Sequence, residues 1–291
     1  MGYFILLRVL LSVTANALQK RLLLDRAGVG HTWVLTYSMM LGPAVIWALP
    51  LPQGGEFWRN VAIGGVLDAL GNLAMVAALR STDISVFGPL NAVRPILALM
   101  FGWMFLGEAP TAIGLAGIAV TVGGGVILFS ENSAPRAERA QAMILRVWKA
   151  VLLRTLGLAL GVVGSVFLKR AATVSSAEGT VAGWILCGLL CLLFCGSFRF
   201  FGGDEGGSHW GALRVHWKWL TIHAAVFLSM QWLTVRIFQE TLLAYSFVFF
   251  QLGMLLQVFV GRIFFQEKAL IRRLIAATIM ALGSVLILWK G

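Results

Sequence analysis

Long hydrophobic runs, separated by short polar breaks, follow one another along the whole chain. Each run holds about 20 mostly apolar residues, enough for a helix to cross a bilayer core of about 30 Å. The short alternating segments typical of a transmembrane β-barrel do not occur. The pattern therefore predicts ten membrane-spanning helices, at residues 3–24, 31–51, 58–79, 82–106, 110–130, 149–172, 179–198, 217–237, 240–265 and 269–289.

One polar break divides the chain nearly in half. It reads "SENSAPRAERAQ", from Ser130 to Gln141, and contains a proline. The hydrophobic runs on either side of it number five each. We therefore predict two five-helix halves, residues 1–130 and 149–291, joined by a polar linker at 131–148.

The two halves resemble each other. A shift of 159 residues places Glu108 on Glu267 and Asn72 on Gln231. Because five spans are an odd number, the second half would enter the membrane in the opposite direction. This predicts an inverted repeat with a pseudo-twofold axis in the membrane plane. Two such halves can open one central site to either side in turn, which points to transport by alternating access.

The end of the first half carries a family resemblance. The segment "STDISVFGPLNAVRPILALMFGWMFLGEAPTAIGLAGIAVTVGGGVIL", Ser81 to Leu128, resembles the last two helices of the EamA-type unit of the drug/metabolite transporter superfamily. The second copy departs from the first, with Met254 where Pro95 stands. The resemblance implies an all-α polytopic membrane protein, with ten transmembrane helices in two inverted five-helix repeats around a central cavity. It also implies a multi-pass protein of the bacterial cytoplasmic (inner) membrane.

The composition is typical of a membrane protein and excludes several other classes of protein. Hydrophobic residues make up 59% of the chain, whereas charged residues make up 12%. The formal net charge of +11 is expected of short basic loops at lipid headgroups, and no basic soluble domain is present to bind nucleic acid. The three cysteines share one helix face, which cannot surround a metal ion. No P-loop or nucleophile motif occurs, so we expect no ATP site, no cofactor and no enzyme activity.

An acidic residue lies inside the third predicted span. Asp68 occurs in "GGVLDALGN", and Asn72 follows one turn later on the same face. Asp68 is either a structural partner for an arginine on a neighbouring helix or a proton-binding residue that couples transport. Asp68 aligns with Phe227 in the second half, so the fold does not need this charge in both copies.

An arginine and a proline interrupt the fourth predicted span. Arg94 and Pro95 align with Gly253 and Met254, so neither recurs in the second half. Proline removes a backbone hydrogen bond near Asn91 and predicts a kink, which a membrane protein tolerates beside a cavity. A guanidinium can donate two parallel hydrogen bonds to a carboxylate or phosphate. We predict that Arg94 contacts substrate; the alternative is a packing partner for Asp68.

Other polar residues complete the candidate sites. Arg236 lies near the end of the eighth span, where it either lines the cavity or extends to the membrane surface. Two basic pairs recur at the ends of spans one and six and are either headgroup anchors or gate charges at the cavity mouths. The candidate substrate-binding residues are Asn72, Asn91, Arg94, Gln231, Arg236 and Gln251, and the candidate gate charges are Lys20, Arg21, Lys169 and Arg170.

Together these residues favour a secondary transporter for a small anionic or zwitterionic metabolite, such as a carboxylate, amino acid or phosphorylated compound. If Asp68 offsets one arginine, the cavity keeps a net positive charge. The expected partners are a small-molecule substrate, membrane lipid, and a coupling proton or counter-substrate. Two alternatives stay open: a broad-specificity exporter of drugs, metabolites or lipids, and a non-transporting membrane sensor or assembly partner.

Overall fold

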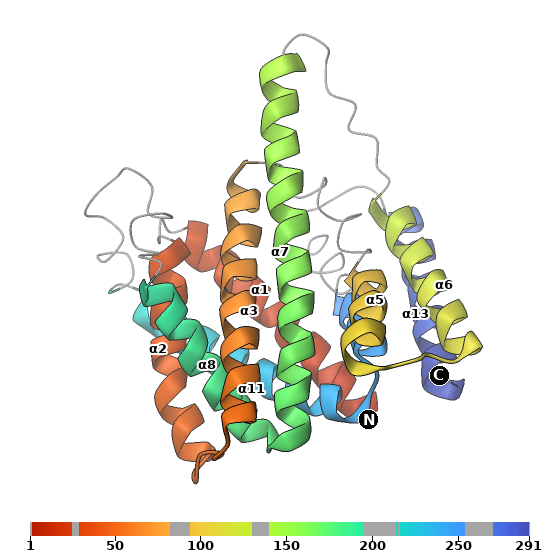
Figure 1. Cartoon of the computed structure of the whole chain (residues 1–291). Helices are drawn as coiled ribbons and strands as arrows, with labels where there is room; N and C mark the ends of the chain where they lie inside the picture. Colours follow the sequence, from red (N-terminus) through yellow and green to blue (C-terminus); the bar gives the residue numbers. More distant parts are fainter. Residues whose placement is uncertain are drawn as a thin grey trace. The chain divides into compact units, whose positions relative to one another are not determined.

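Every regular element in the described part of the chain is an α-helix. The computed structural model describes residues 2–24, 29–81, 94–129, 140–194, 214, 216–253 and 270–290. Figure 1 shows these helices in chain order. The all-α fold class predicted from the hydrophobic runs is therefore confirmed.

The helices fall where the hydrophobic runs predict them. Their bounds are α1 Gly2–Leu24, α2 Val29–Trp47, α3 Gly55–Ser81, α5 Arg94–Leu106, α6 Ala112–Phe129, α7 Ala140–Val174, α8 Ala177–Phe194, α11 Trp217–Glu240 and α13 Leu270–Lys290. A further helical segment without a label in Figure 1 covers Leu243–Gly253. The residues before Arg94, where a kink is predicted near Asn91, lie outside the described ranges.

The start of α7 differs from the prediction. The helix begins at Ala140, whereas the sequence analysis placed residues up to 148 in a polar linker. The segment "AQAMILRVWKA" contains neither proline nor glycine and consists largely of residues with high helix propensity. The predicted span began only at residue 149, but good helix formers without a helix breaker extend the helix toward its N-terminus. The green helix of Figure 1 is correspondingly long.

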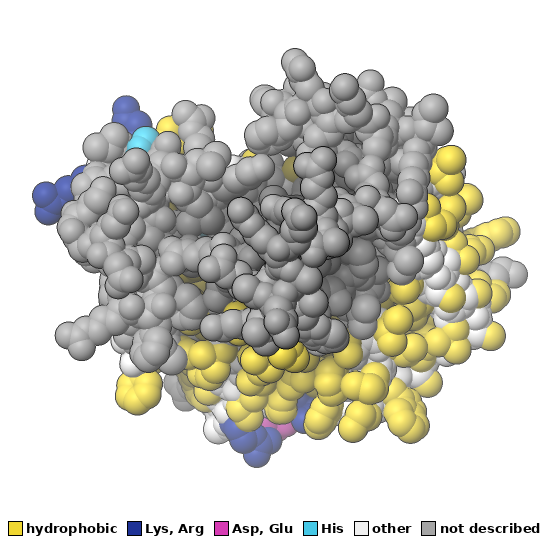
Figure 2. Space-filling model, turned by 90° about the horizontal axis from the view of Figure 1, so that it is seen from above, with side chains coloured by type: hydrophobic (Ala, Val, Ile, Leu, Met, Phe, Trp, Pro, Cys, Tyr) yellow, Lys and Arg dark blue, Asp and Glu magenta, His cyan; other side chains and the backbone are white. Residues whose placement is uncertain are grey.

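Several helices have the length and composition of membrane spans. Among the described residues, four stretches are long and apolar enough to cross a bilayer: Gly2–Gln19, Leu152–Val174, Ala177–Phe194 and Trp217–Glu240. Large apolar side chains are also exposed, including Ile46 at 74% and Phe194 at 93%. Figure 2 shows one face on which the described side chains are mostly hydrophobic and the charged ones form a few small groups. Such an apolar exterior is typical of a polytopic membrane protein.

The chain folds into two compact units, and each unit draws on both halves of the sequence. The first unit contains residues 1–70 and 163–240, and the second contains residues 71–162 and 241–291. Helices α3 and α7 contribute residues to both units. The predicted repeats at 1–130 and 149–291 are divisions of the sequence, so these spatial units do not test them.

Glycines allow close helix contacts in the first unit. Here α1 packs against α11, and α2 packs against α8. Helices α3 and α7 meet at Gly64 and Gly164, where a Cβ on Gly164 would lie 3.0 Å from the Gly64 carbonyl oxygen. Small residues let backbones approach in this way, which favours packing between membrane helices.

The second unit repeats this kind of contact between α6 and α13. A Cβ on Gly117 would lie 2.8 Å from the carbonyl oxygen of Gly283, and a Cβ on Gly283 would lie 2.7 Å from that of Gly117. Helices α3 and α7 meet again in this unit, since a Cβ on Gly71 would lie 2.9 Å from the Gly157 carbonyl oxygen. Side-chain volume is therefore excluded at these crossings.

The helix pairs follow the predicted repeat order. In that order α1 corresponds to α7 and α3 to α11, so the α1–α11 pair is the counterpart of the α3–α7 pair. The α2–α8 and α6–α13 pairs each join corresponding helices. Because this correspondence itself comes from the sequence, the repeat, its inverted orientation and the central cavity stay predictions.

The loop after α5 is fixed to another helix of the second unit. Gly107 adopts a left-handed conformation with φ of 66° and ends α5, as glycine does at many helix C-termini. Glu108 then accepts a hydrogen bond of 2.7 Å at Oε2 from the Leu243 backbone N–H. Leu243 is the first residue of the segment Leu243–Gly253, so the Glu108 carboxylate caps that helix.

Candidate functional site

Arg94 lies at the start of the described part of α5, in the second unit. Its side chain is half-buried, and its Cζ lies 5.2 Å from the ring centroid of Phe247, a cation–π distance. A Cβ on Gly161 of α7 would lie 3.4 Å from Arg94 Nη2. The guanidinium therefore extends between an aromatic ring and a position on α7 that carries no side chain.

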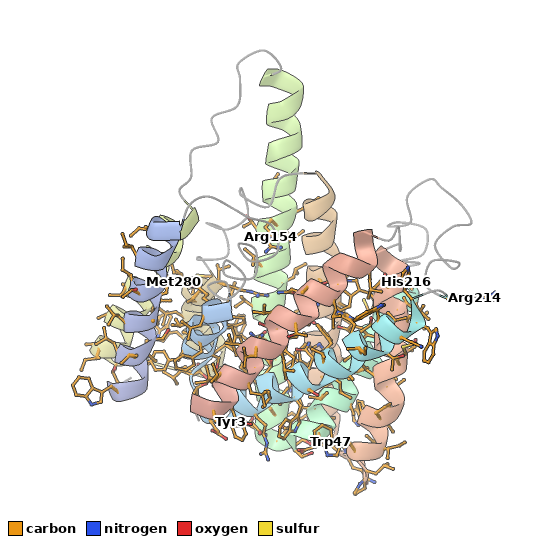
Figure 3. All side chains as sticks on the ribbon, turned by 180° about the vertical axis from the view of Figure 1, so that it is seen from behind. Tyr3, Trp47, Arg154, Arg214, His216 and Met280 are labelled. Carbon is orange, nitrogen blue, oxygen red and sulfur yellow. The ribbon has the colours of Figure 1, made fainter. Side chains whose placement is uncertain are left out.

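A second arginine lies near it. Arg154 of α7 is only 6% exposed, and its charge is close enough to that of Arg94 for the two to repel each other. Arg154 precedes Gly161 by seven residues, or about two helical turns, and so shares its face of α7. Figure 3 shows Arg154 well inside the long helix rather than at its end.

Arg154 is not among the candidate residues predicted from the sequence. The residue falls only a few positions after the predicted start of the sixth span, where an arginine would be expected to extend to the membrane surface. Since α7 begins at Ala140, Arg154 is in fact well within the helix. The same error in the helix boundary thus concealed the buried charge.

An amide completes the group in the second unit. Gln251 is 4% exposed and follows Phe247 by one turn on the Leu243–Gly253 segment, so the two share a helix face. We call Arg94, Arg154, Phe247 and Gln251 the arginine site. Asn72 is also half-buried in this unit, on α3.

The arginine site has the chemistry of an anion receptor. Each guanidinium offers five N–H donors and no acceptor, in a planar arrangement that matches carboxylate and phosphate oxygens. Two like charges held near each other repel, and a bound anion reduces that repulsion. Carboxylate and phosphate groups are the ligands whose oxygens match such donors.

Asp68 belongs to the first unit and is bonded to a tryptophan. Its Oδ2 accepts a hydrogen bond of 3.2 Å from Trp184 Nε1, which joins α3 to α8. The Asp68 side chain is half-buried. Asp68 and Arg94 belong to different units, so the predicted pairing of these two residues stays a prediction.

The predicted polar residues of α11 differ in exposure. Gln231 is 6% exposed, whereas Arg236 is exposed and its Cζ lies 5.5 Å from the ring centroid of Trp232. Trp232 Nε1 in turn donates a hydrogen bond of 2.8 Å to Glu178 Oε1. Arg236 thus has the exposure expected of a side chain that extends to the membrane surface.

The basic pair on α7 is less exposed than a headgroup anchor would be. Lys169 is 9% exposed, and the half-buried Arg170 places its Cζ 5.8 Å from the Phe167 ring centroid. The other candidates, Lys20, Arg21 and Asn91, have side chains outside the described residues. The gate role of both pairs stays a prediction.

The helices and their apolar exterior define a polytopic α-helical membrane protein, and comparison with known proteins narrows the class. Residues 1–130 match the EamA-like transporter family. An "Uncharacterized transporter in cobO 3'region" from Sinorhizobium sp is 28% identical over 82 residues, which cover 28% of this chain and 58% of that relative. The first 130 residues are therefore similar to a transporter family, and the chain spans little more than half the length of this relative.

A solved structure of another protein has the same fold. It superposes with a TM-score of 0.71 and covers 98% of this chain and 94% of its own, at 16% sequence identity. At this identity the likeness concerns the fold alone.

Proposed function

We propose that the protein is a secondary active transporter that moves a small anionic or zwitterionic metabolite by alternating access. The observation that carries this proposal is the pair Arg94 and Arg154, two positive charges that repel each other within one unit, one of them buried. The match of residues 1–130 to a transporter family and the relative named as a transporter support the general activity. The substrate class rests on the arginine site.

Electrostatics indicates the charge of the proposed substrate. Two unit charges about 6 Å apart interact by roughly 3 kcal/mol at an effective dielectric constant of about 20. Near two arginines, this electrostatic energy favours binding of an anion and disfavours binding of a cation. Bidentate hydrogen bonds to a guanidinium add geometric selectivity for carboxylates and phosphates. A carboxylate, an amino acid or a phosphorylated compound fits these requirements.

The helix pairing supports alternating access. Corresponding helices of the two halves pack together in both units, as in α2–α8 and α6–α13. A transporter built from two equivalent halves can exchange their conformations and so change the side to which a site opens. Asp68 is the candidate for the coupling proton, because it is a half-buried carboxylate inside a predicted membrane span, where an ionisable residue is a candidate for proton binding.

A ligand screen by thermal shift tests the substrate class. Purified full-length protein is heated with succinate, glutamate, glycerol 3-phosphate or the lipophilic cation tetraphenylphosphonium. A ligand present at 100 times its Kd stabilises the native state by about 2.7 kcal/mol. We expect at least one of the three anions to raise the Tm. We expect Arg94→Gln and Arg154→Gln to abolish that shift.

Arg59→Gln is the matched control, because Arg59 is an exposed arginine on α3 in the first unit. This variant should retain the full shift. Stabilisation by tetraphenylphosphonium and by none of the anions would instead support a broad-specificity exporter. A shift by an anion that survives both site variants would remove the arginine site from the proposal.

We also propose that the protein resides in the bacterial cytoplasmic membrane. The support is its apolar helices and the bacterial source of the relative. A tagged copy should separate with the inner membrane on a density gradient. Recovery with the outer membrane would contradict this location.

A further inference from the structure

A histidine and a tryptophan are buried together in the first unit. His223 of α11 is 1% exposed and Trp33 of α2 is 5% exposed. Their ring centroids lie 6.3 Å apart in an edge-to-face arrangement. Phe227 stacks on the histidine at 5.8 Å and meets the tryptophan at 5.2 Å. We call Trp33, Thr36, His223 and Phe227 the histidine cluster.

Hydrogen bonding of Thr36 determines which ring nitrogen of His223 carries the proton. Thr36 Oγ1 lies 2.8 Å from the Thr32 carbonyl oxygen and 3.3 Å from His223 Nδ1. Thr36 Oγ1 and the Thr32 oxygen can lie only 2.8 Å apart because a proton lies between them, and the Thr36 hydroxyl has only one proton to donate. Thr36 therefore donates to Thr32 and can only accept from His223. The neutral imidazole must carry its proton on Nδ1.

This tautomer leaves a lone pair on the other ring nitrogen. In neutral histidine the nitrogen without a proton is a hydrogen-bond acceptor, so His223 Nε2 requires a donor. No described residue supplies one, and Trp33 Nε1, which is only a donor, has no acceptor among them either. A buried polar atom left without a partner costs about 1–3 kcal/mol. One cluster thus contains an unmatched donor and an unmatched acceptor.

The two atoms are complementary to a single hydroxyl group. We propose that Trp33 and His223 bind one hydroxyl oxygen, which accepts a hydrogen bond from Trp33 Nε1–H and donates its own proton to His223 Nε2. Two hydrogen bonds of about 2.9 Å through one oxygen join nitrogens that lie up to about 5.8 Å apart, and the two rings are neighbours with centroids 6.3 Å apart. The hydroxyl belongs to an internal water or to an alcohol group of a solute.

The donor and acceptor pattern excludes carboxylate and ammonium groups. A carboxylate has no proton to give to His223 Nε2, and its lone pairs would face the lone pair of that nitrogen. An ammonium group has no lone pair to accept the Trp33 N–H. The surrounding rings of Trp33 and Phe227 offer no further polar atoms, so a ligand with more than one hydrogen-bonding group at this point would lose hydration.

The first test measures the tautomer. Full-length protein labelled with 15N-histidine is studied in lipid nanodiscs by NMR, and the His223→Gln variant assigns the signal among the four histidines. We expect a neutral ring with the proton on Nδ1. Thr36→Ser should preserve this tautomer because it keeps the hydroxyl, whereas Thr36→Val should lose it. A proton on Nε2 in the parent protein would overturn the inference.

The second test identifies the hydroxyl. The Trp33 indole N–H signal is assigned by its loss in Trp33→Phe, and magnetisation transfer to it is measured without solute and then with glycerol as the probe. Transfer from water that persists with glycerol would identify an internal water. Transfer from glycerol protons would identify a solute hydroxyl. Transfer from neither would show a dry cluster and contradict the proposal.

Discussion

The Glu108 cap offers a quantitative test of the second unit. Glu108 Oε2 accepts the Leu243 N–H at 2.7 Å, and Gly102 leaves space for that carboxylate, since a Cβ there would lie 3.2 Å from the same oxygen. Glu108→Ala removes a charged acceptor from the N-terminus of the Leu243–Gly253 segment. Glu108→Gln keeps a neutral oxygen acceptor at the same position. The two variants separate the hydrogen bond from the charge.

Two contributions set the expected loss. A hydrogen bond to a charged group contributes about 1.5–3 kcal/mol, and a negative charge at a helix N-terminus contributes about 0.3–1 kcal/mol. Because Glu108 is only half-buried, we expect about 2 kcal/mol for Glu108→Ala and about 1 kcal/mol for Glu108→Gln. At about 2–4 °C per kcal/mol, the alanine variant should lower the Tm by roughly 4–8 °C.

Thermal unfolding of the purified protein in detergent is the assay. Glu240→Ala is the control, because Glu240 is an exposed carboxylate at the end of α11 and should change the Tm by no more than about 2 °C. A loss for Glu108→Ala that is no larger than that of the control would refute the capping role. Equal losses for Glu108→Ala and Glu108→Gln would show that the charge, and not the acceptor, is responsible.

Three further variants test the helix contacts by thermal unfolding. Gly117→Ala should destabilise the protein by about 1–3 kcal/mol, because its Cβ would lie 2.8 Å from a backbone oxygen of α13. Gly123→Ala on the same helix is the control and should cause no loss of stability, because its Cβ would meet nothing within 4 Å. Equal effects of the two variants would contradict the packing. Trp184→Phe should lose about 1–3 kcal/mol through its hydrogen bond to Asp68, and most of that loss should vanish in an Asp68→Ala background, which has no acceptor; full additivity would argue against the bond. Ser176→Ala should cost about 1 kcal/mol, because its Oγ accepts the Gly179 N–H at 3.0 Å and caps α8; an unchanged Tm would exclude that cap.

The helices could be predicted from the sequence because hydrophobic runs of bilayer length leave little choice of structure. The fifth predicted span, 110–130, matches α6 at Ala112–Phe129. The start of α7 at Ala140 could not be predicted in this way, since α7 extends beyond the length that a bilayer requires. Propensity rather than hydropathy was the signal for it.

The candidate site was predictable only in part. Arg94 stood out as a charge inside a span, and the structure shows it beside Phe247. Arg154 was missed because its burial depends on where α7 begins. The bond between Asp68 and Trp184 joins residues 116 positions apart, and no local pattern indicates it. The tautomer of His223 likewise depends on a threonine of another helix.

Counterflow in proteoliposomes tests the central claim most directly. Vesicles loaded with an unlabelled anion that binds in the thermal-shift screen are diluted into the labelled anion, and initial uptake is compared for the parent, Arg154→Gln and Arg59→Gln. If the arginine site binds the substrate, the parent and Arg59→Gln should accumulate label and Arg154→Gln should lose at least about tenfold, equivalent to about 1.4 kcal/mol. Equal uptake by all three proteins would contradict the arginine site, and no uptake by the parent would contradict transport.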